Sequence, residues 1–166
     1  MAEPRFDPLG LLAALDRHRV AYVVVGAFAR VVHGADELTR GVDIVPSLRT
    51  ENLRRLEEAL DDLEAQRTDG KQLALNDVDP AEEPVIELQT ARGELKIVPQ
   101  PEGTRGYEDL RRAATREPLG AGLRPSVASV GDLARMLAAL GREEDQARLR
   151  SLHRLAELER QLGVEL

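Results

Sequence analysis

The chain contains neither cysteine nor tryptophan, and its other aromatic residues are two phenylalanines and two tyrosines among 166 residues. Without cysteine the protein has no disulfide framework, no thiolate metal site and no cysteine nucleophile. So few aromatic side chains argue against a platform on which nucleic-acid bases stack. The core must therefore consist mainly of leucine, valine and alanine.

An excess of basic charge is also missing, because the formal net charge is −7. Binding to nucleic acids in general requires a basic face, so general nucleic-acid binding is not expected. A local basic patch stays open as an alternative, since arginines are frequent between Arg105 and Arg124.

Apolar runs that approach the about 20 residues of a membrane-spanning helix are absent as well. The first residues, MAEPRFDPLG, lack the basic-then-apolar pattern of a signal peptide. We therefore expect a cytoplasmic protein without membrane contact. A length of 166 residues suits one domain with a proper core.

One stretch near the N-terminus has the pattern of a strand, a glycine turn, a short helix and a second strand. The β-branched run Val20–Val25 predicts a strand that is buried on both faces. Gly26 allows a sharp turn, and Ala27–His33 is long enough for a helix of about two turns. The second predicted strand, Val42–Val45, carries Asp43 among apolar neighbours. A buried acid is costly unless a metal, a cation or hydrogen bonds meet it.

The rest of the chain predicts further helices and a hairpin. Leucines at helical spacing, capping residues and glycine stops indicate the helices, and two apolar-rich runs around a glycine turn indicate the hairpin. The predicted helices are 9–18, 47–64, 107–114, 129–140 and 143–162, the hairpin strands are 84–90 and 94–98, and a short edge strand is predicted over 123–128.

The order of residues in the central stretch resembles a known family. Val25-Gly26-Ala27, His33-Gly34 and Thr39-Arg40-Gly41-Val42-Asp43 follow one another as in the minimal nucleotidyltransferases of the polymerase-β-like superfamily. The AbiEii-like branch, from bacterial abortive-infection and toxin–antitoxin systems, is the most similar in pattern. Gly141-Arg142 and Asp145 match a further family motif, and the resemblance extends from about Leu9 to Leu155.

This resemblance implies an α+β nucleotidyltransferase fold, with a small mixed β-sheet flanked by helices. It also implies a division of the chain into two parts of one compact unit. Residues 1–128 would form the nucleotidyltransferase-like core, and residues 129–166 would form a C-terminal helical hairpin packed on that core.

The family's catalytic acids are largely replaced in this chain. The resemblance implies two acids on the second strand and a third on the hairpin, which together hold magnesium. Here the first position is Gly41, the second is Asp43 and the third is Lys96, in the segment Gly93-Glu94-Leu95-Lys96-Ile97. A family lysine in the helix over 129–140 corresponds to Leu137. Magnesium requires several oxygen ligands, so one carboxylate facing an ammonium is a poor site.

We therefore expect no cofactor. If a metal is bound at all, Asp43 is the only one of the family's metal ligands left to hold it. Lys96 is a candidate ion-pair partner of Asp43, standing where a metal would stand. Nucleotide binding could persist without metal, because a turn before a helix N-terminus can hold an anion. The candidate nucleotide-binding residues are Gly26, Ala27, Thr39 and Arg40.

The leading interpretation is a degraded nucleotidyltransferase that acts by binding a nucleotide or a partner protein, such as the second component of a two-gene system. The alternative is an active enzyme that uses magnesium to move a nucleotide from a nucleoside triphosphate to a protein, RNA or small molecule. An antitoxin-like partner in a phage-defence system is a third possibility that the resemblance implies. Acids that could substitute in catalysis are Asp36, Glu37, Glu87 and Glu94, and His33 is interpreted as structural.

Overall fold

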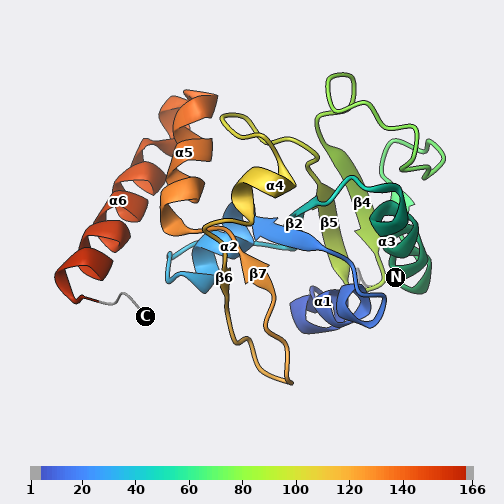
Figure 1. Ribbon diagram of the computed structural model, residues 1–166, viewed down its shortest axis with the longest axis horizontal. Helices are drawn as coiled ribbons and strands as arrows, with labels where there is room; N and C mark the ends of the chain where they lie inside the picture. The colour runs from blue at the N-terminus through green and yellow to red at the C-terminus, as the bar shows by residue number, and fades with distance from the viewer. Residues whose placement is uncertain (1–4, 164–166) are drawn as a thin grey trace.

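The computed structural model describes residues 5–163, so the ends of the two predicted units, 1–4 and 164–166, lie outside it (Figure 1). The strands are β1 (Tyr22–Val25), β2 (Gly41–Pro46), β3 (Gln66–Arg67), β4 (Ile86–Thr90), β5 (Gly93–Ile97), β6 (Thr115–Arg116) and β7 (Ser126–Val127). The helices are α1 (Pro8–Arg17), α2 (Gly26–Val32), α3 (Thr50–Asp62), α4 (Tyr107–Leu110), α5 (Val130–Leu140) and α6 (Gln146–Gln161), with a 3₁₀ turn over Glu143–Asp145.

The strands form one mixed sheet in the order β3-β4-β5-β2-β1-β7-β6. β1 is a central strand that runs antiparallel to β2 on one side and parallel to β7 on the other, and its valines belong to the buried core. The hairpin β4–β5 extends the sheet through a parallel pairing of β5 with β2. The predicted α+β fold with a mixed sheet flanked by helices is confirmed.

The two faces of the hairpin differ in chemistry. In β4, Ile86 and Leu88 are buried while Glu87 and Gln89 between them are exposed. The buried side chains belong to the same apolar core as the leucines of α1 and α3. The opposite face of the hairpin is polar, as expected where a sheet is covered on one side only.

The C-terminal helices lie at one end of the molecule, away from α1 and α3 (Figure 1). Ser129 caps α5 by accepting a hydrogen bond from the backbone N–H of Asp132 (3.0 Å), and Gly141 ends the helix in a left-handed conformation. Both signals were predicted from the sequence. Within residues 5–163, no helix has the length and apolar character needed to cross a membrane.

The structure differs from the sequence-based prediction in several elements. β7 covers only two residues and is not an edge strand, because β6 pairs outside it. The helix predicted over 107–114 ends at Leu110, since the chain then turns into β6. The apolar stripe of the last helix points inward only as far as Leu155, and Leu158 and Leu162 are 45% and 73% exposed. Both short outer strands, β3 and β6, are polar and carry no alternating pattern that predicts a strand.

Candidate functional site

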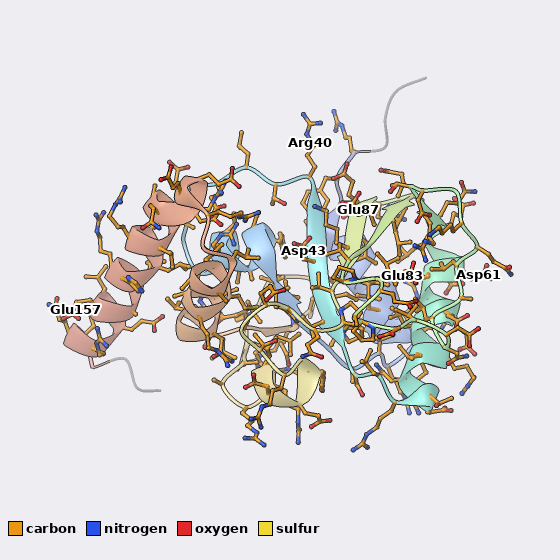
Figure 2. The ribbon with its side chains drawn as sticks, turned by 90° about the horizontal axis from the view of Figure 1, so that it is seen from above. Arg40, Asp43, Asp61, Glu83, Glu87 and Glu157 are labelled. Atoms are coloured by element: carbon orange, nitrogen blue, oxygen red, sulfur yellow. The ribbon has the colours of Figure 1, made fainter. Side chains whose placement is uncertain are left out.

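Asp43 lies against the glycine turn that joins β1 to α2. Gly26 has a φ of +72°, which disfavours any residue with a side chain. A Cβ added to Gly26 would lie 2.3 Å from Oδ2 of Asp43, so the carboxylate occupies the space next to the glycine. Figure 2 shows Asp43 on the side of β2 that faces α2. The strand–turn–helix–strand motif therefore brings Gly26 and Asp43 together, a contact that the sequence analysis did not predict.

Lys96 stands opposite Asp43 on the neighbouring strand. The parallel register of β2 and β5 pairs Asp43 with Lys96, and the antiparallel register of β4 and β5 pairs Lys96 with Glu87. Asp43 and Lys96 are half-buried, and Glu87 is exposed. In the part of the chain that the structure describes, the two charged groups are not within the 4.0 Å of a direct ion pair. Lys96 and Asp43 therefore attract each other over a longer distance, and a direct ion pair between them stays a prediction.

The charges around Asp43 only partly balance. Burial raises the pKa of the Asp43 carboxyl, and the positive charges of Lys96 and Arg30 pull it back. Glu87 and Glu94 push the pKa up again, so that it stays above its ordinary value. A carboxylate in this position gains from any additional positive charge brought close to it.

Position 41 has no space for a side chain. A Cβ at Gly41 would lie 2.5 Å from the backbone oxygen of Glu94 and 2.8 Å from its Cβ. The backbone of β5 therefore occupies the space that a side chain would need. A carboxylate at this position requires a shift of the strand itself.

The residues present do not fit the pair of divalent cations that the sequence resemblance implies. A magnesium ion needs several oxygen ligands in octahedral arrangement, and the three expected positions offer one carboxylate, one glycine and one ammonium group. No group of three or more histidine or acidic residues within residues 5–163 is placed to hold a metal ion.

The other candidate nucleotide-binding residues do not form one site around Asp43. The hydroxyl of Thr39 donates to the carbonyl of Gly41 (2.9 Å), so it is engaged within its own loop. Arg40 is exposed and points away from Asp43 (Figure 2). Ala27 lies in the first turn of α2 beside Gly26, where an incoming anion would meet the carboxylate of Asp43.

Comparison with known proteins shows the fold. No protein-family model and no curated protein matches the chain. A solved structure of a candidate nucleotidyltransferase from Thermotoga maritima superposes with a TM-score of 0.58 at 17% identity, covering 86% of this chain and 88% of that one. The antibiotic-resistance factor ANT(2'')-Ia gives a TM-score of 0.58 at 16% identity, covering 93% and 82%. The chain has a nucleotidyltransferase fold. At this level of identity, the likeness describes the fold alone.

In this nucleotidyltransferase fold, the proposed substitute acids differ in availability. Glu87 and Glu94 are exposed on the polar face near Asp43, and Asp36 is exposed in the preceding loop. Glu37 is committed elsewhere, because its two oxygens accept from Nε (2.7 Å) and Nη2 (3.0 Å) of Arg30. Burial alone would raise the pKa of Glu37, but Arg30 and Arg148 outweigh it and hold the pKa below its ordinary value.

A charged network that was not predicted links α2 to the C-terminal helices. Arg30, which is 9% exposed, binds Glu37, and Glu37 also accepts from Nε of Arg148 (3.2 Å). Arg148 and Arg142 in turn bind Asp145, which is fully buried (3.0 and 2.7 Å). The match of Gly141-Arg142 and Asp145 to the family motif was the available signal in the sequence, whereas nothing near Arg30 indicated its role.

His33 has a structural role, as interpreted from the sequence. Its Nε2 donates to the carbonyl of Ala128 (2.8 Å), the residue between β7 and the cap of α5. The ring thereby fixes the end of α2 against the start of the C-terminal helices.

Proposed function

We propose that this chain is a nucleotidyltransferase-fold protein that no longer transfers nucleotides and acts by binding a nucleotide or a partner protein. The observation that carries the proposal is the pairing of Lys96 with Asp43 across β2 and β5. A catalytic site of this type binds metal ions beside the third acid. In this chain the ammonium group of Lys96 stands at that position and provides a single positive charge.

The chemistry of nucleotidyl transfer explains why this exchange matters. Transfer depends on divalent cations that hold the phosphates and activate the attacking group, with little covalent work by the protein. Lysine cannot coordinate a cation while it is charged, and its charge opposes metal entry next to Asp43. The lack of space at Gly41 supports the same conclusion, since an acid cannot return there without movement of β5.

One observation favours an active enzyme as the second candidate. Glu87 and Glu94 lie near enough to Asp43 to raise its pKa, so three carboxylates share the polar face of the sheet. If Lys96 swings toward solvent, these acids could converge on a metal. The enzyme would then transfer a nucleotide from a nucleoside triphosphate to a protein, RNA or small molecule. Its biological setting would be a toxin–antitoxin or phage-defence system.

The loop before β2 supports binding to a protein. Leu38 is fully exposed, at 101%. Its neighbours are fixed, because Glu37 binds two arginines and Thr39 binds the backbone of Gly41. Leu38 thus offers a partner protein one fixed apolar contact. Leucine is under-represented among binding hot spots, so this contact alone would add little affinity.

The test is calorimetric titration with ATP and CTP, with and without magnesium, together with a transfer assay using labelled nucleotide and magnesium or manganese. The variants are Lys96→Asp, to return an acid, and Asp43→Asn as its control. We expect no metal-dependent binding and no labelling with the natural chain. Magnesium-dependent labelling that is lost in Asp43→Asn would establish the active enzyme instead.

A further inference from the structure

Three adjoining hollows border the short helix α4, which lies in front of the sheet and next to α5 in Figure 1. Their volumes are about 580, 380 and 460 Å³. Glu108 lines the first and second, and Tyr107 lines the second and third, so the three are continuous around the helix. We call this surface the α4 groove.

The α4 groove is strongly basic in an acidic protein. Nine arginines and four carboxylates line it, which leaves a net charge of +5, whereas the whole chain carries −7. The remainder of the chain therefore carries −12. The nine are Arg19, Arg49, Arg55, Arg105, Arg111, Arg112, Arg116, Arg124 and Arg135.

The four acids of the groove are already occupied. Glu51 binds Arg54, Glu108 binds Arg111 (2.8 Å), and Asp109 binds Arg135 (3.1 Å). The fourth, Asp16, accepts a hydrogen bond from the hydroxyl of Tyr22 (3.2 Å).

Most of the arginines, in contrast, have their charge available. Six of the nine make no ion pair with any residue in the range 5–163, and three of these surround the hollow of about 460 Å³. Free guanidinium groups gathered along one surface form an electrostatic footprint for a polyanion. The six are Arg19, Arg49, Arg105, Arg112, Arg116 and Arg124.

The shape of the groove selects among anions. Three open hollows in a row suit an extended ligand better than a compact nucleotide, which one enclosed pocket would hold. All the basic residues are arginine, whose planar group binds phosphate through two hydrogen bonds. Ser47 and Ser126 add hydroxyls, and Tyr107 presents part of its ring. Phosphate and hydroxyl contacts hold a nucleic-acid backbone without reading its sequence, and the single ring of Tyr107 can stack on one base at most.

We propose that the α4 groove binds single-stranded nucleic acid through its phosphates. The groove is separate from the candidate site, because Tyr22 at its edge begins β1 and the Gly26–Asp43 contact lies at the other end of that strand. The proposal is therefore independent of whether Asp43 supports nucleotide transfer. It is also compatible with the net charge, since the acidic remainder weakens long-range attraction but leaves the local positive charge of the groove in place.

The test is fluorescence anisotropy with labelled 15-nucleotide oligo(dT) and oligo(U) at several salt concentrations from 50 to 200 mM. The groove variant is Arg116→Gln with Arg124→Gln. The control is Arg150→Gln with Arg154→Gln, two exposed arginines of α6 that make no ion pair in the described chain. Both variants change the net charge equally. Arg105→Gln with Arg112→Gln serves as a second groove variant, in case the first fails to fold.

We expect at least tenfold weaker binding by each groove variant and less than twofold change in the control. The slope of log affinity against log salt should fall by about 1.4 in the groove variants, since each lost phosphate contact removes about 0.7. Equal losses in groove and control variants, or no binding by the natural chain at 50 mM salt, would overturn the proposal. Equal competition by a poly-glutamate peptide would assign the groove to acidic proteins instead.

Discussion

Lys96 faces Asp43 across the parallel strands β5 and β2, and Gly26 packs against the other side of the same carboxylate. The acid thus lies next to a turn that admits no side chain, and it is in register with a cation that is beyond direct contact. The sequence resemblance implies metal ligands at the positions of Asp43 and Lys96, and in this chain one of the two is a lysine.

The first prediction concerns Lys96. Replacing it by methionine leaves Asp43 half-buried beside Glu87 and Glu94 with less positive charge to balance it. Because Lys96 is itself half-exposed, solvent screening limits the expected loss in free energy of unfolding to about 1 kcal/mol at pH 7. Urea denaturation measures this loss.

The control for Lys96→Met is Lys71→Met, because Lys71 is exposed and is the chain's other lysine. It should change the free energy of unfolding by less than about 0.5 kcal/mol. A double-mutant cycle with Asp43→Asn should give a coupling of about 1 kcal/mol. A coupling near zero would mean that Lys96 does not stabilise Asp43.

The second prediction is that Gly41 tolerates no side chain. Gly41→Ala places a Cβ 2.5 Å from the backbone oxygen of Glu94, which forces β2 and β5 apart. Overpacking of this kind costs about 1–3 kcal/mol. Gly131→Ala in the first turn of α5 is the matched control, because its Cβ would have only one neighbour, Oγ of Ser129 at 3.9 Å. Thermal unfolding should show a lower Tm for Gly41→Ala alone, and equal behaviour of the two variants would contradict the packing argument.

The third prediction separates the two reasons for glycine at position 26. Gly26→Ala meets both a positive φ and the carboxylate of Asp43. In an Asp43→Ala background the carboxylate is gone and only Cβ of residue 43 lies nearby, at 3.2 Å, so most of the remaining loss should be the backbone term of about 1–2 kcal/mol. Chemical denaturation of the four chains in this cycle gives the two terms. If Gly26→Ala costs the same in both backgrounds, the close approach to Asp43 has no energetic consequence.

The sequence predicted the elements around the site because their signals are local. The β-branched run of β1, the glycine turn and the hairpin around Gly93 each lie within a few residues, and all three are found in the structure. The lack of space at Gly41 could not be predicted, because it depends on the register between β2 and a strand about fifty residues later.

The α4 groove could not be predicted from the sequence either, because it also depends on segments that are far apart in the chain. The arginines between Arg105 and Arg124 were visible as a local excess in the sequence, but Arg19 and Arg49 come from α1's end and α3's start. Composition averages over these segments, so a net charge of −7 concealed a surface of the opposite sign. Only the folded chain brings the segments to one face.

The last prediction concerns pH and the buried carboxylate of Asp145. Hydrogen bonds from Arg142, and then from Arg148, hold its pKa below the ordinary value against the effect of burial. A lowered pKa in the folded state contributes stability above the unfolded value of about 3.9, and the contribution is lost as the pH falls through the folded value. Asp145→Asn should therefore destabilise the protein at pH 7 and progressively less below pH 4.

Because Arg142 and Arg148 are about half-exposed, the loss at pH 7 should be about 1–2 kcal/mol rather than the about 3–5 kcal/mol typical of a fully buried pair. Asp61→Asn is the control, since Asp61 is exposed and makes no ion pair within the described residues. Urea denaturation from pH 3 to pH 7 should show the two variants converging at the acid end. A constant difference across this range would mean that packing of the side chain, and not its charge, is what stabilises the C-terminal helices.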